Sequence, residues 1–204
     1  MPPSFISTRK WSLGLVVAIA LVMAACSNKQ EPATSQPAGS QPAADNRIAV
    51  IETNVGTIKI ELLASEAPKT AENFKELAEQ GRYDGTIFHR VISGFMIQGG
   101  DPRGDGSGGQ TATGRPLPNE VNASSPVYQG GYKRGIVAMA NTGRPETGGS
   151  QFFIMHKMTP LQPVYTIFGR VIEGMDTVDK IAAAPNGPGD RPLSPVKMTK
   201  VYIQ

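Results

Sequence analysis

The residues with the clearest chemical potential lie in segment 88–101, where one arginine and one glutamine stand among apolar side chains. An isolated guanidinium is costly to remove from water, so Arg90 is either paired with an acid or held at the edge of an apolar pocket. In the second position its N–H donors can meet an oxygen or nitrogen atom of a ligand. Gly99 and Gly100 let backbone approach closely. The segment therefore predicts a binding cleft to which Arg90 and Gln98 contribute polar groups.

The order of these residues is also distinctive. They read F-H-R-x-x-x-x-F-M-x-Q-G-G-D, and a second segment, 139–154, contains M-A-N followed by G-S-Q-F-F-I. Both segments resemble the signatures of the cyclophilins, which are peptidyl-prolyl cis-trans isomerases. The resemblance extends over residues 47–204. It implies a β-barrel capped by a helix at each end, with the active site on the outer wall.

The resemblance implies that Arg90 and Gln98 are catalytic. It implies a substrate-binding role for eight further residues: Phe95, Met96, Ala140, Asn141, Gln151, Phe153, Leu161 and Tyr165. Among these, the proline pocket would consist of Phe95, Met96, Phe153 and Leu161. Tyr165 stands where the family usually has histidine, and Pro160 where it often has tryptophan. We therefore expect peptide binding to be retained and cyclosporin to bind weakly at most.

Rotation about a peptide C–N bond needs no covalent nucleophile, because its barrier of about 18–20 kcal/mol arises from delocalisation of the nitrogen lone pair. A donor from Arg90 to the prolyl nitrogen would favour the twisted state. We therefore expect acceleration of X-Pro rotation in unfolded or partly folded proteins. Two alternatives remain, a non-catalytic proline-peptide-binding module or holdase, and an Arg90 that is only a salt-bridged structural residue. A hydrolase is excluded because the sequence has no G-x-S-x-G elbow.

The composition fits one globular domain with a tail. The chain has 204 residues, 39% hydrophobic and 18% charged, and its 23 glycines and 17 prolines favour a turn-rich β protein. The net charge of +3 comes from dispersed basic residues, so we expect no nucleic-acid partner. Cys26 is the only cysteine, and the only histidines are His89 and His156, which are too few for a zinc site. We expect no metal, no cofactor and a monomer.

Residues 1–25 predict a signal peptide, because Arg9 and Lys10 precede an apolar run over residues 11–25. Cys26 follows directly, in an arrangement that resembles a bacterial lipoprotein signal, so we expect it to be lipidated. Residues 26–46 are rich in Pro, Ser, Gln and Ala and predict a flexible tether. The predicted location is extracytoplasmic, with a lipid anchor in a bacterial membrane and exported proteins as clients. The alternatives are a secreted soluble protein and an uncleaved anchor.

The rest of the chain predicts a mainly β domain. Apolar spacing predicts helices over residues 68–80 and 175–183. Alternating or short apolar runs between turn residues predict eight strands, at residues 47–52, 57–62, 86–91, 95–99, 135–140, 151–155, 165–171 and 196–203. Two helices are too few to cover both faces of an open sheet. We therefore expect a closed eight-stranded antiparallel β-barrel capped by two α-helices.

Overall fold

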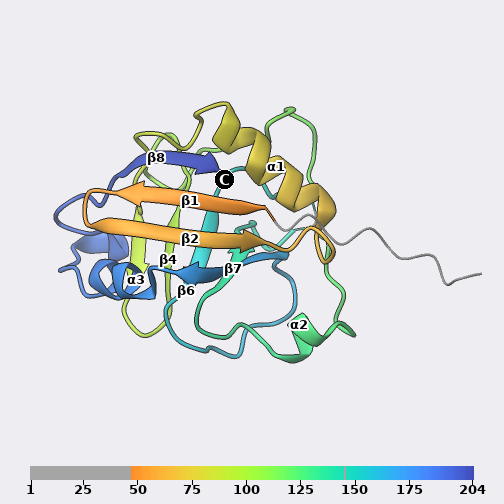
Figure 1. Ribbon diagram of the computed structural model, residues 1–204. Coiled ribbons are helices and arrows are strands. Elements are labelled where there is room, and N and C mark those ends of the chain that lie inside the picture. The colour runs from red at the N-terminus through yellow and green to blue at the C-terminus, as the bar shows by residue number, and fades with distance from the viewer. Residues whose placement is uncertain (1–46, 145) are drawn as a thin grey trace, which may run out of the picture. The chain divides into compact units, whose positions relative to one another are not determined.

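Eight strands and three α-helices make up the computed structural model, which describes residues 47–144 and 146–204 (Figure 1). The strands are β1 (Ile48–Thr53), β2 (Gly56–Leu62), β3 (Arg90–Ile92), β4 (Met96–Gly99), β5 (Ile136–Met139), β6 (Phe152–Met155), β7 (Ile167–Glu173) and β8 (Met198–Ile203). The helices are α1 (Pro68–Glu79), α2 (Pro126–Gln129) and α3 (Met175–Ala182), with a 3-10 turn, η1 (Pro188–Asp190). Seven of the eight predicted strands match observed strands closely, whereas the strand predicted at residues 86–91 begins only at Arg90, as β3. The two predicted helices are α1 and α3.

The strands form one antiparallel sheet in the order β3-β4-β6-β5-β7-β2-β1-β8. This confirms the mainly β class, whereas the predicted closure of the barrel is not confirmed. No ladder joins β3 to β8 within the described residues, and the sheet is a curled half-barrel. Between β3 and β8, Ile87 makes single bridges to Asp101 and Lys197. A turn in which Thr86 donates to the carbonyl of Tyr83 precedes it, so the extended segment there is too short for a ladder.

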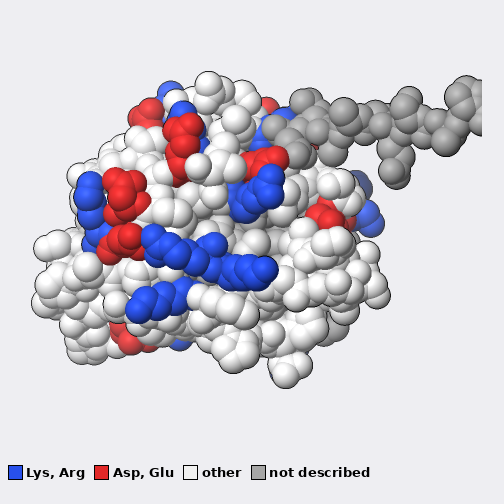
Figure 2. All heavy atoms as spheres, turned by 60° about the horizontal axis from the view of Figure 1, so that its bottom comes forward, with Lys and Arg blue, Asp and Glu red and all other residues white. Residues whose placement is uncertain are grey.

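Alternation along the strands separates the core from the outer surface. On β2, Ile58 and Ile60 are fully buried, whereas Lys59 and Glu61 point outward. These two charges pair across the ladder with Glu173 and Arg170 of β7; Lys59 Nζ lies 2.7 Å from the Glu173 carboxylate. The space-filling view shows basic and acidic side chains next to each other on the same part of the surface (Figure 2).

Helix α1 covers one end of the core. Its face bears Phe74 and Leu77, both fully buried. The Phe74 ring packs against Tyr83, Phe152 and Phe168 at centroid distances of 4.8–5.3 Å. Such aromatic contacts add to the stabilisation from burial alone. They attach α1 to β6, the strand that also carries part of the outer face described below.

Helix α3 positions the segment that follows it, which packs against β3. Gly174 precedes the helix as its N-cap, with a φ of +89° that suits glycine, and a Cβ there would overlap the backbone of Thr57. Val178 and Ile181 are buried against the sheet, so the position of the helix is fixed by packing. The chain that follows, residues 183–192, contains η1 and packs against β3. A segment distant in sequence thereby reaches Arg90.

Candidate active site

The outer face of four neighbouring strands carries three of the predicted residues, together with Ala138, in one row. In the ladders Arg90 pairs with Gln98, Gln98 with Phe153, and Phe153 with Ala138. Residues directly opposite each other in a ladder project from the same face of the sheet. The alternate residues of these strands belong to the inner core: Val91, Ile97, Val137 and Ile154. The outer face also carries apolar residues, which explains why segment 88–101 has apolar residues at adjacent positions, such as Val91-Ile92 and Met96-Ile97.

This outer face borders a cavity of about 390 Å³. Nine of the ten predicted catalytic and substrate-binding residues line it: Arg90, Phe95, Met96, Gln98, Ala140, Asn141, Phe153, Leu161 and Tyr165. They come from β3, β4, β6, the turn between β3 and β4, and the segments after β5 and β6. The tenth, Gln151, lies in an adjoining hollow of about 250 Å³ that shares Gln98 with the first.

The apolar wall of the cavity is held in place from behind. The Phe153 ring meets the Tyr165 ring edge to face, at a centroid distance of 5.4 Å. The carbonyl oxygen of Tyr165 accepts hydrogen bonds from the hydroxyls of Tyr132 (2.8 Å) and Tyr128 (3.2 Å). Burial raises the pKa of Tyr132 to about 12, so this hydroxyl remains a donor at neutral pH. Tyr165, at the position where the family usually has histidine, is therefore fixed as part of the wall.

A chain of amide hydrogen bonds crosses from one hollow to the other. Gln98 Nε2 donates to Gln151 Oε1 at 2.9 Å. Gln151 Nε2 in turn donates to the carbonyl oxygens of Gly106 (3.0 Å) and Gly108 (2.7 Å). This network joins β4 to the glycine-rich loop 101–109. It fixes the orientation of the Gln98 amide at the edge of the cavity.

The loop 101–109 is itself held by a buried carboxylate. Asp101 is fully buried, and its two oxygens accept the backbone N–H groups of Arg103 (2.9 Å), Asp105 (3.2 Å) and Gly106 (2.6 Å). Three charge-assisted bonds offset the cost of removing this charge from water. Asp101 therefore determines the shape of the loop that borders both hollows.

Arg90 reaches the cavity from the first residue of β3, with 42% of its side chain exposed. Its Nε lies 3.5 Å from Asp190 Oδ2 at the end of η1. The arginine is thus both at the rim of an apolar pocket and paired with an acid, two positions that the sequence analysis treated as alternatives. The sequence P-G-D-R-P around Asp190 is typical of a turn. It contains no signal that the turn reaches Arg90, so this contact was not predicted.

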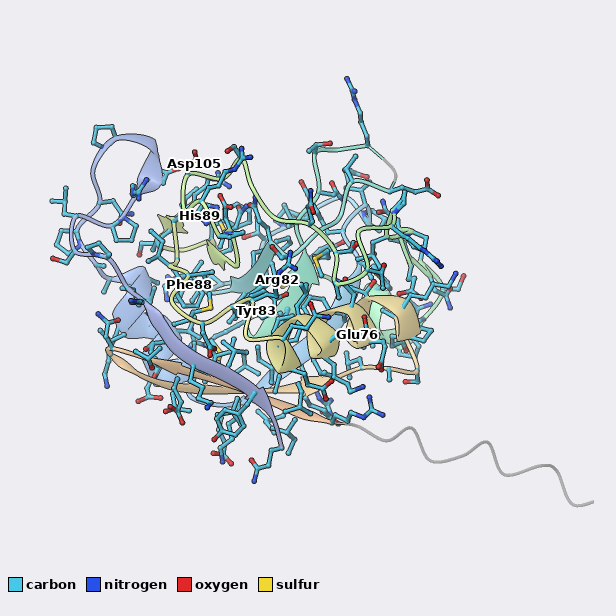
Figure 3. All side chains as sticks on the ribbon, turned by 90° about the horizontal axis from the view of Figure 1, so that it is seen from above. Glu76, Arg82, Tyr83, Phe88, His89 and Asp105 are labelled. Atoms are coloured by element: carbon cyan, nitrogen blue, oxygen red, sulfur yellow. The ribbon has the colours of Figure 1, made fainter. Side chains whose placement is uncertain are left out.

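Four further cavity residues were not among the predicted catalytic and substrate-binding residues: His89, Asp105, Gly106 and Gly189. Figure 3 shows His89 between Asp105 and Phe88. The His89 side chain is largely buried, with the residue 6% exposed. Burial lowers its pKa below the ordinary value, and the nearby Asp101 carboxylate opposes this shift only in part. His89 is therefore neutral at neutral pH.

The lowered pKa of His89 predicts a loss of stability in mild acid. The unfolded chain binds the proton near pH 6.5, whereas the folded protein binds it only at lower pH. The contribution of His89 is thus complete above pH 6.5 and is lost as the pH falls toward the folded-state pKa, by at most about 1.4 kcal/mol per pH unit. Urea unfolding of wild type and His89→Gln at pH 7.5 and 5.0 measures it. An equal pH dependence in both proteins would contradict the assignment.

The chain is similar in sequence to proteins of one known family. The family model described as cyclophilin type peptidyl-prolyl cis-trans isomerase matches residues 48–203. The chain is 48% identical over 154 residues to peptidyl-prolyl cis-trans isomerase CYP18-1 of Arabidopsis thaliana, covering 75% of this chain and 93% of the relative. It is 45% identical over 153 residues to peptidyl-prolyl cis-trans isomerase-like 1 of mouse, covering 74% and 89%.

A solved structure is similar as well. It is a cyclophilin type peptidyl-prolyl cis-trans isomerase of Cryptosporidium parvum, determined in the presence of the dipeptide Ala-Pro. The TM-score is 0.71 at 38% identity, and the match covers 77% of this chain and 98% of that chain.

The same comparisons correct the predicted location. Relatives at 44–48% identity are plant, fungal and mammalian cyclophilin-like proteins, which contradicts the lipid-anchored, extracytoplasmic placement in a bacterial cell. The predicted signal peptide, the lipidated Cys26 and the tether fall on residues 1–46, outside the described residues. Within residues 47–144 and 146–204, no helix combines the length and the apolar character needed to cross a bilayer.

The family model matches the region that holds the antiparallel sheet, its outer cavity and Arg90. The matched residues, 48–203, include every residue predicted to be catalytic or to bind substrate. Identities of 44–48% over nearly whole relatives exceed what a shared fold alone requires. The chain belongs to the cyclophilin type peptidyl-prolyl cis-trans isomerase family of enzymes.

Proposed function

We propose that this cavity binds X-Pro segments of peptides and partly folded chains and accelerates rotation about the prolyl bond, with no covalent intermediate. The observation that carries the proposal is the position of Arg90, at the rim of a cavity walled by Phe95, Met96 and Phe153. A proline ring is apolar and fits such a wall. The adjacent prolyl amide would then lie within reach of the Arg90 guanidinium. That group supplies the hydrogen-bond donor that the proposed reaction needs.

The proposed role of Arg90 is to stabilise the twisted amide. As the C–N bond rotates, the lone pair of the prolyl nitrogen is no longer delocalised and becomes a hydrogen-bond acceptor. Raising a rate of about 10⁻² per second to about 1–10³ per second requires lowering the barrier by about 3–7 kcal/mol. A charge-assisted hydrogen bond contributes about 1.5–3 kcal/mol net. The remainder is assigned to a preorganised donor in a cleft from which substrate excludes water.

Gln98 is proposed to orient the substrate backbone. Its amide nitrogen is engaged with Gln151, which leaves its carbonyl oxygen with a fixed direction beside the cavity. A fixed acceptor can hold a backbone N–H of the substrate while the prolyl bond turns. Because Gln98 and Arg90 are paired across the β3–β4 ladder, the two contacts would be made at a constant spacing.

The substrate class is tested by refolding. A denatured protein whose slow refolding phase is X-Pro isomerisation should refold faster with catalytic amounts of this protein, and its fast phases should be unchanged. If the protein is only a holdase, it should need equimolar amounts and should slow refolding instead. That second result would support the non-catalytic alternative and contradict the proposal.

A further inference from the structure

The loop that follows α3 is attached to β3 beside Arg90. Asn186 Nδ2 donates to the carbonyl oxygen of Val91, the residue after Arg90, at 2.5 Å. The loop also closes on itself, because the N–H of Gly187 donates to the carbonyl of Arg191 at 2.8 Å. These bonds hold the intervening η1 turn against β3, with Gly189 lining the cavity. The turn is therefore a fixed part of the cavity rim.

Within this turn Asp190 has an unusual backbone conformation. Its φ is +59°, in the left-handed region, directly after Gly189 at φ +72°. Non-glycine residues rarely adopt this conformation, and glycine would occupy it with less strain. The conformation turns the Asp190 carboxylate to the Arg90 guanidinium, with 3.5 Å between Oδ2 and Nε. A strained residue that contacts the central arginine suggests a role in its activity.

We propose that Asp190 is a positioning residue for Arg90, an inference that rests on the proposed function. The contact is made at Nε, the atom of the guanidinium nearest the stem of the side chain. The two terminal Nη groups, with four N–H donors, are thereby left for the substrate. Arg90 is 42% exposed, and its long side chain would otherwise sample several rotamers in water. Asp190 reduces this freedom before substrate arrives, and the ion pair strengthens when substrate displaces water from the cleft.

Two substitutions distinguish the contribution of the Asp190 side chain from that of its backbone conformation. Asp190→Asn has nearly the same size and tolerates positive φ but removes the charge, and Asp190→Gly removes the side chain and relieves the strain. Both should lower kcat for an X-Pro peptide by about threefold to tenfold while KM changes by less than about twofold. Their melting temperatures should stay close to that of wild type. A loss of activity that follows a loss of stability would assign Asp190 a purely structural role and overturn the proposal.

A double-mutant cycle with Arg90 tests the pathway of the effect. In an Arg90→Ala background, Asp190→Asn should have no further effect on kcat, because Asp190 acts through the arginine. An equal fold-loss of kcat in the wild-type and Arg90→Ala backgrounds would contradict the proposal. A higher kcat in Asp190→Asn alone would contradict it too, because it would mean that Asp190 keeps Arg90 away from substrate. Arg191→Gln, in the same loop, serves as the control for a charge change without contact to Arg90.

A measurement without turnover keeps this inference separate from the proposed function. The ¹⁵N relaxation of the Arg90 Nε–H group reports the mobility of the guanidinium in the purified full chain. Asp190→Asn should increase that mobility and shift the Nε–H resonance. Should wild type fail to accelerate any X-Pro peptide, the proposed function fails, and the relaxation data still decide whether Asp190 orders Arg90. Unchanged mobility in Asp190→Asn would overturn the inference even in an active enzyme.

Discussion

Replacing Arg90 with alanine is expected to lower kcat/KM for an X-Pro peptide by about 100-fold or more, with peptide affinity within a few-fold of wild type. Affinity should persist because Phe95, Met96 and Phe153 still form the apolar wall. The rate should fall because the donor to the prolyl nitrogen is lost, and no other described arginine or lysine lines this cavity. Relaxation of a cis-enriched peptide toward its trans equilibrium gives the rate, and titration calorimetry gives the affinity.

Two control variants make this test specific. Arg82→Ala removes an exposed arginine that does not line the cavity, so its rate should equal that of wild type. Arg90→Lys keeps the positive charge but loses the planar array of donors, so it should retain only a small part of the rate. A near-normal rate in Arg90→Ala, with an intact fold by circular dichroism, would mean that the arginine is structural.

The largest effect on stability at the site is expected for Asp101→Ala. The fully buried carboxylate accepts three backbone N–H groups, from Arg103, Asp105 and Gly106, and its removal leaves these donors without their partner. We expect the free energy of unfolding to fall by about 3 kcal/mol or more. KM should rise too, because Gly106 lines the cavity and the loop would lose its shape. Urea unfolding and peptide kinetics on the surviving folded protein measure the two effects.

Asp105→Asn is the matched control for Asp101→Ala. Asp105 lies in the same loop but is exposed, and its side chain contacts Ser107. Its pKa is lowered by these hydrogen bonds to Ser107. Stability should change little in this variant at neutral pH. Equal losses in the two variants would show that net charge in the loop, and not the three bonds to Asp101, stabilises it.

Much of the fold could be predicted because its signals are local. The spacing of Ala71, Phe74 and Leu77 identifies the buried face of α1, and the alternation of Ile58 and Ile60 identifies β2. Closure of the barrel could not be predicted in the same way. It depends on whether the few residues before β3 stay extended. There the turn that precedes Ile87 leaves isolated bridges and a few backbone hydrogen bonds to residues 196–198, and no continuous ladder.

The residues of the site likewise fall into those that local sequence signals identify and those that depend on the path of distant segments. Arg90, Gln98 and Phe153 could be selected from sequence because they lie in two motif segments, and pairing of β3, β4 and β6 brings them together. Asp190 is a hundred residues away from Arg90 in the chain, and its contact depends on the path of a loop with no periodicity. His89 was not assigned to the site from the sequence. Its burial at the cavity edge depends on the fold of loop 101–109.

The measurement that tests the central claim most directly is the rate of cis-to-trans relaxation of a short X-Pro peptide, with and without the purified wild-type protein. The account predicts a relaxation rate that rises in proportion to enzyme concentration, at an unchanged final cis/trans ratio, since a catalyst does not alter the equilibrium. Peptide that binds in the cavity and relaxes at the uncatalysed rate, over tens to hundreds of seconds, would contradict it. The protein would then be a proline-peptide-binding module.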